Sequence, residues 1–135
     1  MNQSPNPALM DDTGKLVLRL VLGILILFHG VAKIRYGIGP IEGMLMSRGI
    51  PAVLAWPVYL GEVVGPLMLI AGYFARIGAA LIVVNMIVAI LVAHSGDLLS
   101  LTQFGGWQLE LQGMYLFTAL ALALMGPGRF SINRR

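Results

Sequence analysis

A single carboxylate, Glu62, lies inside an apolar run that is long enough to cross a bilayer. An ionised carboxylate in hydrocarbon costs several kcal/mol, so Glu62 must be paired, protonated or in contact with water. Pro66 has no N–H, so the carbonyl of Glu62, four residues earlier, loses its helical donor, and we expect the helix to kink or loosen there. Gly61 and Gly65 form a G-x-x-x-G step that lets a neighbouring helix approach closely, within one bundle or between protomers. This stretch predicts an integral membrane protein with a polar interior.

Other polar residues join Glu62 in the same half of the predicted bilayer. His29 and Lys33 are four residues apart on one helix and therefore share a face. Tyr59 lies one turn before Glu62, on the same face. The set of candidate ligand-binding residues is His29, Lys33, Tyr59, Glu62, Asn85, His94 and Glu110. No metal site is predicted.

Simpler roles compete with ligand binding for most of this set. Lys33 can extend its ammonium to the headgroups, and Asn85 can hydrogen-bond between helices. His29 can be a packed helix residue, and Glu110 an interfacial one. Glu62 is too deep for such an explanation and is the strongest functional candidate.

Helical geometry and charge refine this picture. Asn85 and His94 are nine residues apart and about half a turn out of phase, so we expect Asn85 to face inward and His94 to lie at the mouth. Glu62 and Glu110 bring two carboxylates against the one ammonium of Lys33. We expect Lys33 to pair with Glu110, closer to water, and Glu62 to remain the neutral acid. Glu62, His29 and Glu110 are then the candidates for a proton relay.

Composition agrees with a membrane protein. Of 135 residues, 58% are hydrophobic and only 11% are charged, whereas about a quarter of a soluble domain is charged. The net charge of +3 does not indicate nucleic-acid binding, because the basic residues stand at the ends of apolar runs. The chain has no cysteine, which excludes a disulfide relay, thiolate-bound zinc and cysteine-ligated iron–sulfur clusters. Redox chemistry would therefore need a bound cofactor or a partner protein.

The hydrophobic pattern predicts an all-α fold, an integral membrane four-helix bundle running up-down-up-down. Its spans are 16–34, 53–73, 77–94 and 107–125. Residues 1–14 read as a short polar tail and not as a cleaved signal peptide, since they are acidic and lack a basic start. Residues 35–52 connect the first two spans and contain a possible short helix, 41–48, which either lies in the interface or plugs the bundle. A loop at 95–106 precedes the fourth span.

Basic residues orient the bundle. Lys15 and Arg19 stand at the start of the first span and are expected to reach the headgroups. The side that holds both termini has six basic residues, Lys15, Arg19, Arg76, Arg129, Arg134 and Arg135. The other side has three, Lys33, Arg35 and Arg48. The positive-inside rule then places both termini in the cytoplasm.

An ordered set of short motifs resembles the DoxX family of small bacterial inner-membrane proteins. The set comprises Phe28-His29-Gly30-x-x-Lys33, Leu60-Gly61-Glu62, Asn85, Ala93-His94, Gly106-Trp107-x-x-Glu110 and Gly126-Pro127-Gly128-Arg129-Phe130-Ser131. The resemblance covers residues 15–132, which we expect to form one transmembrane domain after the tail at 1–14. It implies a four-helix membrane protein that serves quinone-linked or oxidative-stress chemistry.

Three functions remain open from the sequence. The first is a membrane subunit of a redox system that holds a quinone or similar aromatic ligand near Glu62. The second is a small binding or transport module that passes a metal ion or small solute. The third is a structural anchor for a larger complex. The expected partners are the lipid bilayer, a redox protein complex or a second copy of the chain, and no nucleic acid. The expected location is the bacterial inner membrane.

Overall fold

Three helical stretches are long and apolar enough to cross a membrane, Pro7–Tyr36, Ala52–Ala71 and Ala75–Ala93, and a shorter apolar helix covers Glu110–Met125. The computed structural model describes residues 6–135, and within them the chain is helical with no β-strand. The elements are α1 (Pro7–Tyr36), α2 (Gly39–Ser47), the 3-10 turn η1 (Ala52–Ala55), the π-helical turn η2 (Leu60–Val64), α3 (Gly65–Ala71), α4 (Ala75–Ala93), the 3-10 turn η3 (Ser95–Asp97) and α5 (Glu110–Met125). The prediction of an all-helical membrane protein is confirmed.

Two predicted boundaries were wrong. α1 already begins at Pro7, because the side chain of Asn6 accepts a hydrogen bond from the backbone N–H of Ala8 (3.0 Å) and caps the helix. Residues 7–14 of the expected tail are therefore helical, and residues 1–5 lie outside the described part. The fourth helix begins at Glu110, three residues later than predicted.

The predicted short helix in the first connection is confirmed as α2. Its side chain Leu45 is buried with Ile38 and Ala55, so the helix rests on η1 and on the nearby end of α4. It is thus packed against the bundle by its own small apolar cluster.

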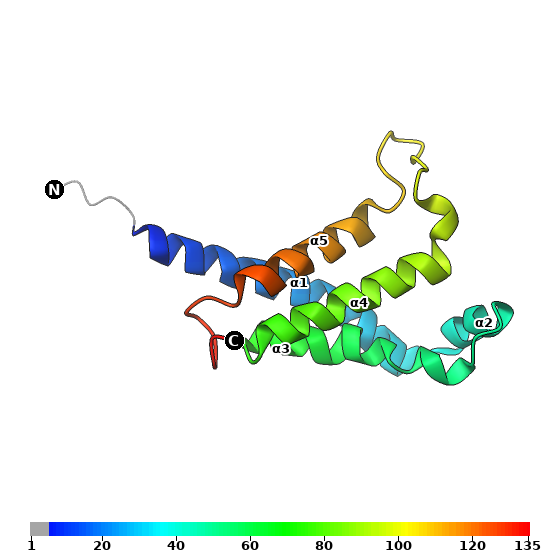
Figure 1. Cartoon of the computed structure of the whole chain (residues 1–135), viewed down its shortest axis with the longest axis horizontal. Coiled ribbons are helices and arrows are strands. Elements are labelled where there is room, and N and C mark those ends of the chain that lie inside the picture. Colours follow the sequence, from blue (N-terminus) through cyan, green and yellow to red (C-terminus); the bar gives the residue numbers. More distant parts are fainter. Residues whose placement is uncertain (1–5) are drawn as a thin grey trace.

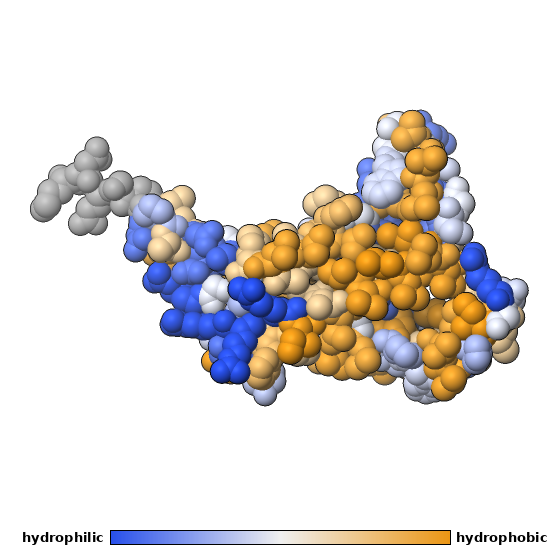
Figure 2. Space-filling view, viewed as in Figure 1, coloured by the Kyte–Doolittle hydropathy of each residue, from blue (hydrophilic) through white to orange (hydrophobic). Residues whose placement is uncertain are grey.

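α4 is the central helix of the bundle, with α5 and α3 packed along it, and α1 packs mainly on α3 and to a smaller extent on η2 and α5. Leu69, Ala79 and Ile82 have no exposed surface and form the middle of the core. The first turns of α1 and the C-terminus lie toward one end of the molecule, and α2 and the loop before α5 lie toward the other (Figure 1). Hydrophobic residues dominate the visible surface between these ends, while hydrophilic residues gather near the chain termini (Figure 2). This distribution suits a chain surrounded by lipid.

The second stretch loosens just before Pro66, as the sequence predicts. The backbone N–H of Gly65 bonds the carbonyl of Leu60, five residues earlier, so Leu60–Val64 forms a π-helical turn. Pro66 then stands in the first turn of α3, where a missing N–H costs least. The proline thus widens one turn, and the helix continues after it.

The G-x-x-x-G step serves contacts within the bundle. A Cβ on Gly65 would stand 2.8 Å from the carbonyl oxygen of Gly78 on α4. A Cβ on Gly61 would stand 2.2 Å from the Cβ of Asn85. Real Cβ atoms do not approach so closely, so these glycines allow α4 to lie directly against the second stretch.

Arg19 does not reach the headgroups, and that prediction was wrong. Its side chain is only 1% exposed. Its guanidinium donates to the carbonyls of Leu69 (2.9 Å) and Ile70 (3.3 Å) at the end of α3. It also donates to the carbonyls of Pro127 (3.1 Å) and Phe130 (2.7 Å) in the segment after α5. Arg19 therefore joins α1, α3 and the C-terminal segment through backbone carbonyls near the ends of α3 and α5.

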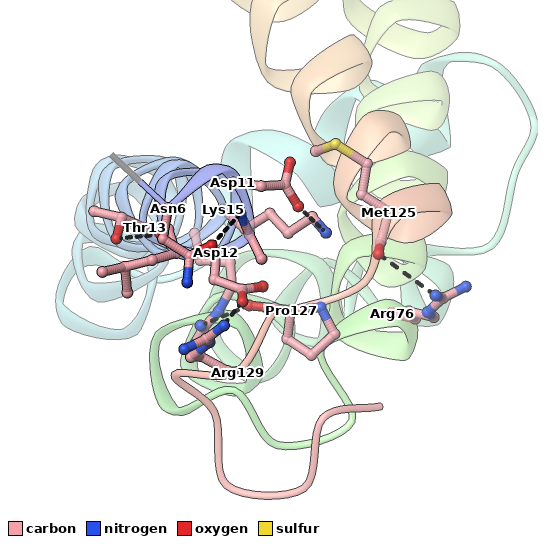
Figure 3. A network of polar contacts seen from close by, with 12 residues as sticks. Asn6, Asp11, Asp12, Thr13, Lys15, Arg76, Met125, Pro127 and Arg129 are labelled. Carbon is pink, nitrogen blue, oxygen red and sulfur yellow. Dashed lines mark hydrogen bonds and ion pairs between the residues drawn. The ribbon is translucent and has the colours of Figure 1, made fainter. Parts of the chain in front are cut away.

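Further polar contacts hold the same end of the molecule together (Figure 3). Arg129 donates to the carboxylate of Asp12 (2.8 Å), which links the C-terminal segment to α1. Lys15 pairs with Asp11 one turn away on α1 (2.8 Å). These pairs are partly exposed, so each contributes little to stability by itself.

We predict that Arg19→Met destabilises the protein by about 3 kcal/mol or more, because four buried carbonyls lose a charged donor. Arg19→Lys should recover only part of this loss, since an ammonium cannot reproduce the planar fork of a guanidinium. The matched control, Arg129→Met, removes an exposed ion pair and should cost no more than about 1 kcal/mol. Unfolding in detergent, followed by circular dichroism, measures all three. Equal losses for Arg19→Met and Arg129→Met would contradict the prediction.

Candidate functional site

A cavity of about 200 Å³ lies between α1, η2, α4 and α5. Its polar wall consists of His29, Glu62, His94, Gln112 and Tyr115, and the remaining wall is apolar. The residues come from four elements that are far apart in the sequence. Three of the seven predicted site residues, His29, Glu62 and His94, are therefore brought together at one cavity.

Lys33 and Glu62 form an ion pair at this site, with the ammonium donating to Oε2 of the carboxylate. The side chain of Glu62 is 11% exposed and that of Lys33 is 24% exposed, so the pair is largely shielded. The expected pairing of Lys33 with Glu110 was wrong. The long stem of a lysine can carry its ammonium along the helix toward a deeper carboxylate, so the backbone position alone does not decide the pairing.

Tyr59 supports the pair from the second stretch. Its hydroxyl donates to the backbone carbonyl of Lys33 (3.1 Å), near the end of α1. The same carbonyl also accepts the backbone N–H of Gly37, the residue that caps α1 (2.8 Å). Tyr59 thus fixes the position of Lys33. It does not bond Glu62, although the two residues lie one turn apart on the same helix face.

The π-helical turn presses Glu62 against α1. A Cβ added at Gly30 would stand 2.1 Å from the carbonyl oxygen of Glu62. Pro66 cannot donate to this carbonyl, because it has no N–H. The carbonyl lies against Gly30, where α1 has no side chain in its way. Gly30 lies three residues before Lys33, on the same face of α1. The close contact at Gly30 therefore brings the carboxylate of Glu62 within reach of the Lys33 ammonium.

His29 and Tyr115 meet where α1 and α5 come together. Their rings are arranged edge to face with centroids 6.2 Å apart. His29 remains exposed on the protein surface although it also lines the cavity. His94 is the residue at which α4 ends, and its Nδ1 lies 3.4 Å from the carboxylate of Asp97. Because His94 has left the helix, its direction is not fixed by the helical period that separates it from Asn85.

Asn85 and Glu110 do not line the cavity. Asn85 is half-buried against Gly61, as an inward-facing residue should be. Glu110 is exposed, and its carboxylate folds back toward the backbone of Gly106. Of the three proton-relay candidates, Glu62 and His29 therefore line the cavity and Glu110 does not.

Sequence reasoning missed Gln112 and Tyr115 as site residues. They are three residues apart on α5 and therefore lie on one face of the helix. That spacing, next to an apolar run, was the available signal. Without the position of α5 relative to α1, however, nothing in the sequence connects this face to His29.

The family model DoxX matches residues 14–95, which include every cavity residue outside α5. A protein of Bacillus subtilis (strain 168) named "Putative oxidoreductase CatD" is 29% identical over 115 residues, or 85% of this chain and 81% of that protein. No solved structure matches the chain.

We predict strong coupling between Lys33 and Glu62 in a double-mutant cycle. Lys33→Met should destabilise the protein by roughly 2 kcal/mol, because it leaves a shielded carboxylate without its partner. Adding Glu62→Gln should recover about 1 kcal/mol or more, since the neutral amide needs no counter-charge. The cycle Asp11→Asn with Lys15→Met tests an exposed pair and should show a coupling of about 0.5 kcal/mol or less. Additive losses at Lys33 and Glu62, measured by unfolding in detergent, would refute the coupling.

Proposed function

Because the chain belongs to the DoxX family, we propose that it is a membrane subunit of a redox system whose cavity holds a quinone or a similar ring compound. The observation that carries this proposal is a shielded ion pair, Lys33–Glu62, beside a cavity that contains His29 and Gln112. Polar groups in a membrane bundle are costly and mark functional sites by default. The oxidoreductase name of the Bacillus subtilis relative supports the redox part of the proposal.

The cavity residues fit a quinone ring in chemistry and in size. A quinone ring has two carbonyl acceptors, flat apolar faces and no net charge. Gln112 carries an amide donor, and His29 carries a ring N–H donor. A cavity of about 200 Å³ is small for a whole ligand, since typical pockets measure about 300–1,000 Å³, but it can take one substituted ring.

A bound quinone would supply two-electron, two-proton chemistry, and the residues of the chain have two roles. The imidazole ring of His29 can donate a proton from one nitrogen and accept one at the other, so its side chain suits proton transfer to a ring oxygen. Lys33 offsets the charge of Glu62, so the ion pair adds no net charge beside the ring. Electrons would come from another bound cofactor or from a partner redox protein, because the chain has no cysteine to bind an iron–sulfur cluster.

The proposal includes a topology in the bacterial inner membrane. Four spans in alternating directions would place both termini in the cytoplasm and the cavity in the outer half of the bilayer. The ion pair between Arg129 and Asp12 supports a common side for the two ends of the chain. Arg19 is buried, so we leave it out of the count of surface charges. The side with the two termini then has five basic residues and the other side three. The excess of positive charge still favours cytoplasmic termini.

Reporter fusions test this topology. We expect alkaline phosphatase to be inactive when it is fused after Arg135 and active when it is fused after Ser100. A green fluorescent protein fusion at the same two positions should give the opposite pattern and serves as the control. Phosphatase activity at the C-terminus would overturn the orientation.

Quinone binding tests the function. We expect lipids extracted with the purified protein to contain quinone, and His29→Leu to weaken quinone binding in nanodiscs about tenfold through the loss of one hydrogen bond. Glu110→Gln is the matched control, because it removes a polar residue outside the cavity, and its affinity should equal that of the wild type. The proposal fails if quinone binds no better than to empty nanodiscs, or if both variants bind equally.

A further inference from the structure

α1 and α5 border a gap, which we call the α1–α5 seam, that runs past His29 and Tyr115. α5 packs closely along α4, whereas its contact with α1 is slight. Arg19 and the C-terminal segment hold the two helices together at one end of the molecule. At the other end they diverge, since α1 leads to α2 and α5 begins below the protruding loop (Figure 1). The seam is therefore closed at the Arg19 end and weakest near the cavity.

The seam combines polar and apolar side chains in an order that suits a lipid-facing entrance. His29 is exposed and touches Tyr115 across the seam, directly in front of the cavity. Phe28, next to His29 on α1, and Leu111, about one turn before Tyr115 on α5, are exposed apolar side chains. A histidine that faces hydrocarbon without a polar partner is unfavourable. A ligand group that passes or occupies the seam would supply that partner.

The size of the cavity limits which part of a ligand it can hold. About 200 Å³ can take a ring but not a ring with a long tail. The tail of such a ligand must leave the cavity, and the bilayer is the only apolar medium around the seam. The cavity and the seam therefore fit the two parts of one amphipathic molecule.

We propose that the α1–α5 seam is a lateral entrance through which a ring compound with an apolar tail enters from the outer leaflet of the membrane. The ring passes between His29 and Tyr115 into the cavity, and the tail stays in the lipid between Phe28 and Leu111. This proposal rests on the proposed function for the ring, and it adds the tail, the route and the lipid phase as the source of the ligand.

Single cysteines test the route cleanly, because the natural chain has none. Ala89→Cys places a thiol on the cavity wall, and Ser100→Cys places one in the loop as a water-side reference. An uncharged, lipid-soluble maleimide should label Ala89→Cys in nanodiscs at least about tenfold faster than a charged thiosulfonate reagent does, since a charge enters hydrocarbon poorly. The charged reagent should label Ser100→Cys readily.

A pair of tryptophan variants locates the entrance. Leu111 and Leu120 are both exposed leucines on α5, but only Leu111 borders the cavity. Leu111→Trp should slow the maleimide labelling of Ala89→Cys at least about fivefold by narrowing the seam, and Leu120→Trp should leave the rate unchanged. Circular dichroism of each variant confirms that the fold is retained.

Each result decides a different statement. If the charged reagent labels Ala89→Cys as fast as Ser100→Cys, the cavity opens to water and the lateral entrance is wrong. If Leu111→Trp has no effect, the ligand does not pass the seam. If both labelling results appear as expected while quinone fails to bind, the entrance stands and only the ring assigned to the proposed function is wrong.

Discussion

The buried guanidinium of Arg19 is the interaction on which the arrangement of the helices depends. A charge in an apolar bundle is tolerated only when every donor has an acceptor. Arg19 finds four carbonyls, two at the end of α3 and two after α5. One side chain thus joins three segments at one end of the molecule.

Closure at one end allows the other end to remain open. Helices that are joined near Arg19 need not pack along their whole length, and α1 and α5 do not. The π-helical turn packs against α1 and α4 and places the carbonyl of Glu62 against α1. Gly30 permits this because it offers no Cβ to the Glu62 carbonyl. The ion pair with Lys33 then stabilises the widened turn, so the cavity follows from a proline, a glycine and a lysine on two helices.

The sequence predicted the local features of this site better than its long-range contacts. The burial of Glu62, the effect of Pro66 and the close packing at Gly61 and Gly65 all follow from a few neighbouring residues. The burial of Arg19 could not be predicted in this way, because two of its acceptors lie more than 100 residues later in the chain. A basic residue near a helix end is typical of headgroup contact, and only the folded C-terminal segment reverses that interpretation.

The partner of Lys33 was mistaken for a related reason. Counting about 1.5 Å per residue places Glu62 roughly 9 Å deeper than Lys33, which favoured the shallower Glu110. Backbone depth ignores the length of the lysine stem and the sideways shift that the π-helical turn gives to Glu62. Tyr115 was missed because its role depends on which helix lies opposite α5, and hydrophobic periodicity does not determine the order of helices around a bundle.

The charge balance of the site distinguishes between the functions that the sequence left open. Lys33 and Glu62 neutralise each other, and Arg19 is satisfied by carbonyls at the far end of the bundle. The cavity therefore has hydrogen-bonding groups but no uncompensated charge to offer a ligand. To gain a counter-ion, a metal ion or charged solute would have to break the Lys33–Glu62 pair. It would also lose its own hydration shell, which is unfavourable. A neutral ring with carbonyl acceptors needs neither step. The same neutrality that lets the pair exist in a bilayer thus favours an uncharged, lipid-soluble ligand over an ion.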